Sequence, residues 1–347
     1  MAYTTVNKST SYVTAKELTA NQGGNMVVTG VGFQPDMVWL KARDLSANWK
    51  QYDAVRGVEK EIRSNTTGAE EDNSNGLTAF SSDGFTWGID SDINYNNTNP
   101  TSWAWKAGTT SGITTNGSTD TTPSSYSFNQ TAGISILKYA GSGSTPTKIA
   151  HGLGVAPKLI IVKNLSGTAD WVLGHGDMAW TKYIYLSSNA ASVTAGGAAW
   201  ENTAPDTVNF TVGDNTQINA SGSNYIAYCF SEVVGFSSFG KYTGNGNTDG
   251  KFCYTGFKPA IVLCKRTNGT SNWGIFDNKR DPLNTVNKTL FPNSDTTQDS
   301  STVRMDFLSN GFKHRTTDTA WNGSGDEYIW IAFAAEPIVG TNPATGY

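Results

Sequence analysis

Three histidines and several groups of acidic side chains are the residues in this sequence whose types could do chemistry. The histidines, at 151, 175 and 314, form no H-x-x-x-H or H-E-x-x-H pattern, and no G-x-S-x-G, Walker or strand-to-helix G-x-G-x-x-G motif occurs. A glycan hydrolase needs two carboxylates roughly 5 to 10 Å apart. The candidates lie in polar, Gly- or Asn-rich segments, where carboxylates are usually solvated: Glu70-Glu71-Asp72, Asp90 with Asp92, Asp206 with Asp214, and Asp326-Glu327. We therefore predict no catalytic residue, no metal site and no cofactor, and expect that the protein is not an enzyme.

A polar segment from Lys313 to Gly325 carries the side chains best suited to holding a ligand. It contains His314, Arg315 and Trp321. A flat indole beside cationic donors suits a sugar ring that carries hydroxyl groups or a carboxylate. Because the surrounding residues are mostly Thr, Asn and Gly, we expect Trp321 to be exposed. These three residues form the predicted ligand-binding site.

A signature of the form G-x-x-P-x5-K occurs three times and indicates an internal repeat. It spans Gly32 to Lys41, Gly154 to Lys163, and Gly256 to Lys265. The Gly-x-x-Pro turn should lead into a strand, and the apolar run after the proline has the length of a buried central strand. We expect the lysine to mark the point where that strand reaches water. A tryptophan follows each proline by 14 positions and is predicted to fill the core: Trp49, Trp171 and Trp273.

Positions that differ between the copies separate core residues from candidate binding residues. Asp53 and Asp277 each follow the signature tryptophan by four positions, and His175 takes that place in the second copy. We expect His175 to end its strand and to hydrogen-bond a neighbouring turn. Aromatic residues without a counterpart in the other copies remain candidates for contacts with a ligand or partner: Trp180, Tyr183, Tyr185, Trp200 and Trp321.

The composition favours short strands joined by many turns. Of the 347 residues, 16% are charged, 12% are aromatic and 37 are glycine. Each copy of the repeat has the size of one β-sandwich. We predict an all-β fold of three tandem antiparallel β-sandwich, jelly-roll-like units at residues 1–108, 126–232 and 233–347, the last with a short C-terminal tail. Residues 109–125 form a Gly-, Ser- and Thr-rich linker. The best candidate for a helix is 55–64, with a strand or turn as the alternative.

Charge and cysteine content exclude several classes of partner. The formal net charge is −4 with no block of like charge, so nucleic-acid binding is not expected. No apolar segment is long enough for membrane insertion as a helix. Cys229, Cys253 and Cys264 have no C-x-x-C spacing, which indicates packed, reduced thiols. The first residues do not read as a secretory signal, so we expect synthesis in a cytoplasm.

The sequence from Tyr225 to Gly250, followed by Tyr254 to Pro259, resembles the repeat of an uncharacterised family of virion structural proteins of marine tailed bacteriophages. Members of that family are often labelled tail fibres. Its G-F-x-P and F-D-x-x-R-G elements recur at 32–35 and at Tyr52 to Gly57, with Tyr in place of Phe. The second copy departs from the pattern at Leu153-Gly-Val and at His175. The resemblance covers nearly the whole chain and implies a location in the virion after synthesis in the cytoplasm of a bacterial host. It carries over no catalytic residue.

These observations lead to the expectation of a non-enzymatic bacteriophage virion protein, a tail-fibre or appendage component that contacts a glycan or protein of the host surface. Its other partners would be tail or capsid proteins. Exposed strand edges with little protecting charge favour a homo-oligomer, and a trimer is usual for fibres. The alternatives are a capsid decoration protein or head fibre and, third, a polysaccharide depolymerase.

Overall fold

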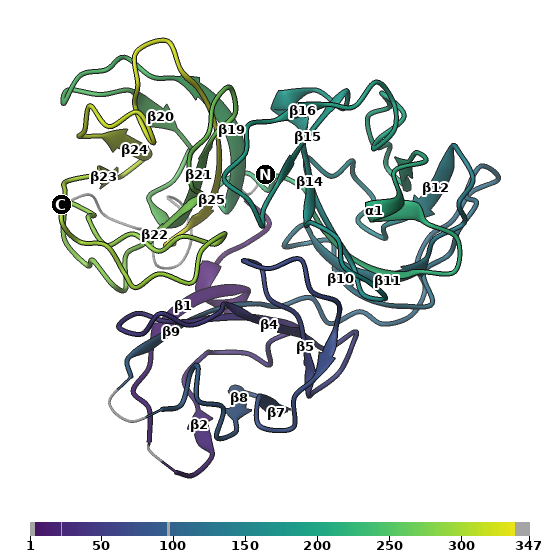
Figure 1. The fold of residues 1–347 in the computed structure, drawn as a ribbon, viewed down its shortest axis with the longest axis horizontal. Helices are drawn as coiled ribbons and strands as arrows, with labels where there is room; N and C mark the ends of the chain where they lie inside the picture. The colour runs from purple at the N-terminus through teal and green to yellow at the C-terminus, as the bar shows by residue number, and fades with distance from the viewer. Residues whose placement is uncertain (1–3, 22, 96–97, 337–347) are drawn as a thin grey trace.

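The computed structural model describes residues 4–21, 23–95 and 98–336, and its regular structure is nearly all antiparallel β-strand (Figure 1). The one α-helix in these ranges is the four-residue α1 (Thr216–Asn219). Residues 55–64, the best candidate for a helix, form turns followed by the two-residue strand β5 (Lys60–Glu61), so the strand-or-turn alternative is the correct one.

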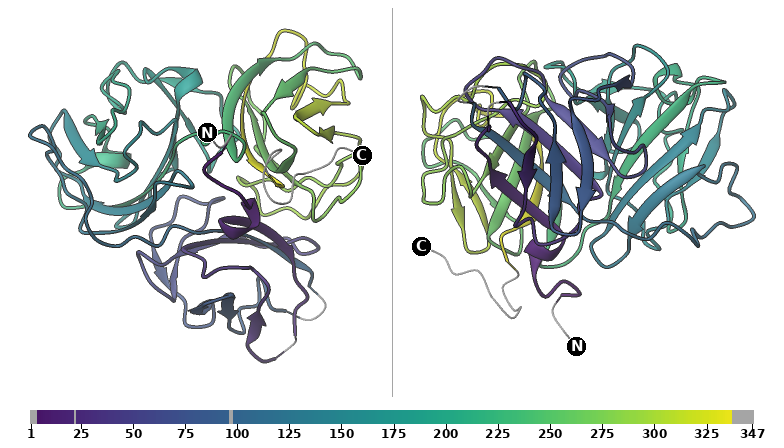
Figure 2. Two further views of the ribbon diagram at one scale, coloured as in Figure 1. Left: turned by 180° about the vertical axis from the view of Figure 1, so that it is seen from behind. Right: turned by 90° about the horizontal axis from the view of Figure 1, so that it is seen from below.

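The strands form three groups around a common centre, which we call lobes 1, 2 and 3 in chain order (Figures 1 and 2). Besides β5, lobe 1 contains β1 (Val13–Glu17), β2 (Met26–Val28), β3 (Met37–Ala42), β4 (Lys50–Asp53), β6 (Glu71–Asp72), β7 (Leu77–Ser81), β8 (Gly84–Trp87) and β9 (Pro100–Trp105). Lobe 2 contains β10 (Ser125–Asn129), β11 (Ile134–Ala140), β12 (Thr147–Ala150), β13 (Leu159–Asn164), β14 (Val172–His175), β15 (Lys182–Tyr185), β16 (Val193–Thr194), β17 (Asn209–Val212) and β18 (Asn224–Phe230). Lobe 3 contains β19 (Ser237–Thr243), β20 (Phe252–Tyr254), β21 (Pro259–Arg266), β22 (Gly274–Asp277), β23 (Met305–Leu308), β24 (Gly311–His314) and β25 (Glu327–Ala334).

Each lobe has one larger sheet and one smaller sheet. The larger sheets have the orders β1-β9-β3-β4, β10-β11-β18-β13-β14-β15-β16 and β19-β25-β21-β22. The smaller sheets are β2-β8-β7, β12-β17 and β20-β24-β23, and lobe 1 has a further β5-β6 pair. The signature strand therefore lies between the same two neighbours in every lobe. The strand register is also the same in each lobe. The residue two positions after the signature proline pairs with the last residue of the strand that follows the signature tryptophan: Met37 faces Asp53, Leu159 faces His175, and Ile261 faces Asp277. This register confirms that His175 takes the place of the two aspartates.

Apolar side chains fill two kinds of core. Inside each lobe a cluster lies between the larger and smaller sheets, as between Leu40 and Phe85 in lobe 1. A further cluster contains side chains from all three lobes and includes Trp49, Trp171 and Trp273, each fully buried as predicted. The larger sheets are therefore covered on both faces, which is why their central strands are nearly continuous apolar runs.

The indoles of the three signature tryptophans join each lobe to another. The Nε1–H of Trp171 in lobe 2 donates to a carbonyl of lobe 1, that of Trp273 in lobe 3 to one of lobe 2, and that of Trp49 in lobe 1 to one of lobe 3. The acceptors are the carbonyl oxygens of Arg63 at 3.0 Å, Tyr185 at 2.8 Å and Phe291 at 2.8 Å. Because the third contact returns to lobe 1, the lobes form a closed ring within one chain.

Two backbone hydrogen bonds accompany each indole contact. In the loop before each tryptophan, one N–H donates to the neighbouring lobe and one carbonyl accepts from it. The donated bonds are Ala169 to Thr67 at 2.9 Å, Ser271 to Asn189 at 2.9 Å, and Ala47 to Asp295 at 3.0 Å. The returned bonds are Glu70 to Leu165 at 3.1 Å, Ser192 to Thr267 at 2.8 Å, and Gln298 to Arg43 at 2.7 Å. The three interfaces thus use the same hydrogen bonds at the same positions of the repeat.

Both ends of the described chain lie at one end of this ring. The N–H of Ser9 and the hydroxyl of Thr10 donate to the carboxylate of Glu336, at 3.0 and 3.1 Å. The nearby strand β1 begins at Val13, opposite Trp105, and Trp105 in turn faces Met37, where β3 begins. The loop that follows β3, which docks on lobe 3, is therefore at the opposite end of the sheet.

Candidate functional site

Trp321 is buried and does not present its indole to solvent. Only 1% of its surface is exposed, and its ring packs edge-on against Phe276 at 5.4 Å between centroids. The expectation of an exposed Trp321 is therefore wrong. The side chain of the next residue, Asn322, donates to Asn245 and to the carbonyls of Asn247 and Thr316, which holds this polar segment down over the core of lobe 3.

The other two predicted ligand-binding residues are also engaged within lobe 3. His314 is fully buried between Tyr242 and Phe312, and burial lowers its pKa to about 3. The guanidinium of Arg315 is paired with Asp306 at 2.5 Å and with Asp249 at 3.2 Å. The structure therefore does not bring the three residues together as an exposed sugar-binding platform.

The other aromatic candidates mainly serve packing. Trp200 and Tyr183 are buried in the core of lobe 2, and Trp180 stands edge-on to Trp200 at 5.7 Å. Tyr185 is partly exposed, and its hydroxyl accepts from the side chain of Gln217 at 3.0 Å.

Most of the acidic groups singled out in the sequence hold loops and strands in place. Asp90 and Asp92 both face the buried ammonium of Lys50, at 3.4 and 3.0 Å. Glu70 pairs with Arg56, Glu71 with Arg63, and Asp326 with Arg266. Asp206 accepts from two backbone N–H groups, which lowers its pKa although partial burial opposes this shift.

The three signature lysines are buried, so the expectation that they emerge into water is wrong. Lys41, Lys163 and Lys265 have no exposed surface. Each ammonium donates to two carbonyl oxygens near the hairpin loop, as Lys163 does to Thr67 at 3.0 Å and to Ala169 at 2.7 Å. Burial lowers the pKa of Lys41 and Lys163 to about 8 and that of Lys265 to about 7. These lysines donate to carbonyls of the docked loops, and two of the carbonyls, those of Thr67 and Asn189, also accept a backbone N–H.

Buried ion pairs occupy two of the three lobe interfaces. Arg56 binds Asp53 and Arg280 binds Asp277, each at 2.6 Å, and each aspartate also accepts from a side chain of another lobe. These donors are the hydroxyl of Tyr228, at 2.7 Å from Asp53, and the indole of Trp103, at 3.2 Å from Asp277.

The interface between lobes 2 and 3 carries His175 and Met178 at the positions of the aspartate and the arginine. The Nδ1 of His175 accepts from the N–H of Asp177, so Nε2 carries the proton and faces the carbonyl of Trp330 at 3.4 Å. Burial lowers the pKa of His175 to about 4, which keeps the ring neutral. A carboxylate at position 175 would repel the carbonyl of Trp330. Lobe 2 therefore lacks both the aspartate and the arginine that pair in the other two lobes.

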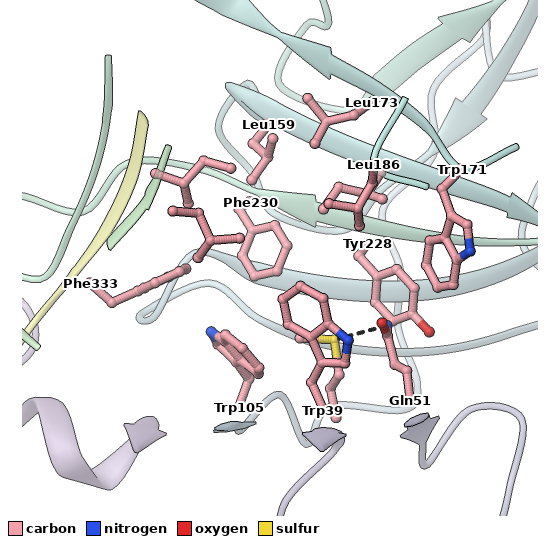
Figure 3. Close-up of a pocket in the computed structure, with 14 residues that line it drawn as sticks. Trp39, Gln51, Trp105, Leu159, Trp171, Leu173, Leu186, Tyr228, Phe230 and Phe333 are labelled. Carbon is pink, nitrogen blue, oxygen red and sulfur yellow. Dashed lines mark hydrogen bonds between the residues drawn. The ribbon is translucent and has the colours of Figure 1, made fainter. Parts of the chain in front are cut away.

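The centre of the ring is apolar and holds only a small cavity of about 40 Å³ (Figure 3). Trp39 and Trp105 of lobe 1, Trp171 and Phe230 of lobe 2, and Phe333 of lobe 3 point toward it. A cavity of this size has room for a few water molecules at most, and water needs polar partners. The cavity is therefore a packing defect and cannot hold a substrate.

The largest hollow described is a groove of about 570 Å³ between lobes 2 and 3. Lys182 of lobe 2 and Lys241 and Lys251 of lobe 3 line it, together with the carboxylates of Asp177 and Glu327. Its volume lies in the range of small-molecule sites. We call it the lysine groove and take it as the candidate functional site. Sequence reasoning missed it because its lysines come from two lobes and share no motif.

The antiparallel sheets and their layered cores define an all-β protein of β-sandwich-like architecture. The chain belongs to the family described as "Domain of unknown function (DUF7483)", which matches residues 8–337 and so runs across all three lobes. No curated protein and no solved structure matches the chain significantly. Among the described residues, no helix has the length and apolarity to cross a membrane.

Proposed function

We propose that the protein is a bacteriophage virion component, in a tail fibre or appendage, that binds a glycan or protein of the host surface and breaks no bond. The sequence resemblance supports the virion location. The observation that carries the proposal is the contact of Ser9 and Thr10 with Glu336, because it brings the first and last segments of the described chain together at one end of the ring. A ring attached to the particle through that end presents its docked loops and the lysine groove outward.

The proposal includes the finer organisation of the chain. Each lobe is one β-sandwich, jelly-roll-like unit of a tandem repeat, at 1–108, 126–232 and 233–347. The repeated hydrogen bonds and the common register of the signature strands support this division. The segment 109–125 connects the first two units, and it runs along lobe 2, where Thr109 pairs with Phe128 and Thr121 with Ile149.

Capsid decoration is the second candidate, and one observation favours it. The three repeated interfaces give a single chain an approximate threefold arrangement, which matches a local threefold position in a shell. Self-association into a homotrimer is a separate part of the proposal. Light scattering at micromolar concentration tests it, with a mass of three chains as the expected result.

The test of the function uses virions that lack this protein. We expect them to adsorb to host cells more slowly than complete virions and to regain the normal rate when the protein is supplied. Electron microscopy of the particle should locate the chain in the tail. Normal adsorption together with a less stable head would instead support decoration. Release of new reducing ends from host polysaccharide would contradict the non-enzymatic proposal.

A further inference from the structure

We propose that the lysine groove binds a saccharide that carries an oxyanion, either a carboxylate or a phosphate. This inference rests on the proposed function, because it names the chemical class of ligand that the surface contact would recognise.

The lysine groove has more positive charge than its own carboxylates neutralise. Lys241 and Lys251 are exposed and Lys182 is partly buried, and no ion pair to any of the three occurs among the described residues. Of the two lining carboxylates, Asp177 is already paired with Lys158 at 3.3 Å. Only Glu327 is left to balance three ammonium groups.

Lys182 has a counterpart in each of the other lobes, and both counterparts have an acidic partner. Each lysine stands two residues before a residue that pairs with the strand after the signature tryptophan. Ile62 pairs with Gln51, Ile184 with Leu173, and Leu290 with Ile275. Lys60 of lobe 1 is paired with Asp72, and Lys288 of lobe 3 is paired with Asp281. The lobe that forms one wall of the groove is thus the one in which this lysine is unpaired.

Within the described residues, Lys241 also lacks an ion-pair partner, whereas the residue at its position in lobe 1 has one. The strand register places Glu17 at the position of Lys241, since Glu17 faces Thr101 and Lys241 faces Ile329 on the closing strand. Glu17 is neutralised by Arg43. The residue at the position of Arg43 in lobe 3 is Thr267, which is uncharged. The corresponding surface of lobe 1 is therefore self-compensated, whereas the lysine groove is not.

A lysine ammonium is a compact charge with three donors, so it suits the oxygens of a carboxylate or phosphate. Thr243 adds an exposed hydroxyl to the lining of the groove, which can bond the hydroxyl groups of a sugar. A hollow of about 570 Å³ accommodates a short saccharide. A stable protein partner requires a much larger surface, on the order of 1,200 Å² or more. The groove therefore favours a saccharide over an acidic protein.

The experiment measures binding of defined probes to the full chain by titration calorimetry. The probes are an oligogalacturonate, a hexose phosphate, a neutral malto-oligosaccharide, inorganic phosphate and an oligoglutamate peptide. The test variant is Lys182→Gln/Lys241→Gln/Lys251→Gln. The control variant, Lys8→Gln/Lys138→Gln/Lys148→Gln, removes the same charge outside the groove. Circular dichroism and urea unfolding establish that both variants fold.

We expect at least one acidic saccharide to bind the wild type and the control alike and to bind the test variant about tenfold or more weakly. Added salt should weaken this binding. Comparison of the galacturonate and hexose phosphate arms identifies which oxyanion is preferred. The inference is overturned if the test variant keeps wild-type affinity, if the neutral saccharide, free phosphate or the peptide binds as tightly, or if no acidic saccharide binds.

The same variants separate this inference from the proposed function. If virions that carry the test variant bind host cells normally and virions without the protein do not, the groove is rejected as the contact site and the proposed function stands. If the groove binds an acidic saccharide but virions that lack the protein adsorb normally, the proposed function is rejected and the binding site stands.

Discussion

At the scale of single residues, buried polar groups at equivalent positions of the three lobes hold the loops in place. The signature lysines are the clearest case, because each brings an ammonium to loop carbonyls inside the ring. A neutral amine still has two N–H groups, enough to satisfy the two carbonyls that each lysine contacts. The neutral amine can therefore keep both hydrogen bonds and avoid the larger cost of burying a charge.

Lys265 should make stability depend on pH. Its pKa is about 7 in the folded chain, against an ordinary value of 10.5. Between these values the unfolded chain holds a proton that the folded chain has released, so the contribution of this group to the free energy of unfolding increases as pH rises. We expect the stability of the wild type relative to Lys265→Met to increase from pH 7 to pH 10 in urea titrations. A difference that is constant or falls with pH would show that the buried lysine stays charged. Lys138→Met, at a half-exposed lysine, is the matched control.

Trp273 combines core packing with a hydrogen bond to Tyr185. Trp273→Ala should lower the free energy of unfolding by about 3 to 5 kcal/mol, because it leaves a cavity and an unpaired carbonyl. Trp180→Ala, at a partly exposed tryptophan of lobe 2, should cost clearly less. Equal losses in guanidinium titrations would argue against a central role for the signature tryptophans.

The Asp277–Arg280 pair should show strong coupling. Arg280→Met alone leaves a buried carboxylate without its cation and should cost about 3 to 5 kcal/mol. Adding Asp277→His reproduces the combination that lobe 2 carries at His175 and Met178, and this change should restore part of the loss. A double-mutant cycle of unfolding free energies measures the coupling. Additive effects would mean that the charges do not depend on one another.

At the scale of elements, the hairpin loops act as docking elements between lobes. Amide protons of Ala169 and Ser271 are bonded to carbonyls of other lobes, although they lie outside regular strands. We expect these protons to exchange with solvent as slowly as those of the central strands. Amides of the exposed loop residues Ser46 and Asn268 should exchange quickly. Hydrogen-exchange NMR or mass spectrometry makes the comparison, and fast exchange at 169 and 271 would show that the loops open independently.

The signature strands could be predicted from the sequence because their signals are local. The turn before Pro259 and the apolar residues after it specify a buried strand, and β21 begins at that proline. The docking of the loops could not be predicted in this way. The hydrogen-bond acceptors in the neighbouring lobe are backbone carbonyls, which every residue type has. Trp321 was misjudged for a related reason: its polar neighbours indicated a solvated loop, whereas the side chain of Asn322 folds that loop onto the core.

At the scale of the whole molecule, the three lobes share one central core. Trp273, Ile331 and Phe333 of lobe 3 pack in a cluster with residues of lobes 1 and 2. The chain should therefore unfold in a single cooperative transition in calorimetry. The fragment 233–336 would expose these residues, and we expect it to lack near-ultraviolet circular dichroism and to aggregate. Separate transitions for the lobes, or a well-folded fragment, would contradict the shared core.

The head-to-tail order of the interfaces also affects whether separate molecules can polymerise by exchanging lobes. A lobe that docks head to tail could exchange with the same lobe of a second chain, and repeated exchange would produce open filaments. Tethering in one chain opposes this, because it gives each neighbour an effective concentration in the millimolar range. The three interfaces are also unlike: Asp53 meets Tyr228, Asp277 meets Trp103, and His175 meets the carbonyl of Trp330. Lobe 1 or 3 inserted in the place of lobe 2 would set a carboxylate against the carbonyl of Trp330, so the divergence of the copies opposes pairing between lobes in the wrong order.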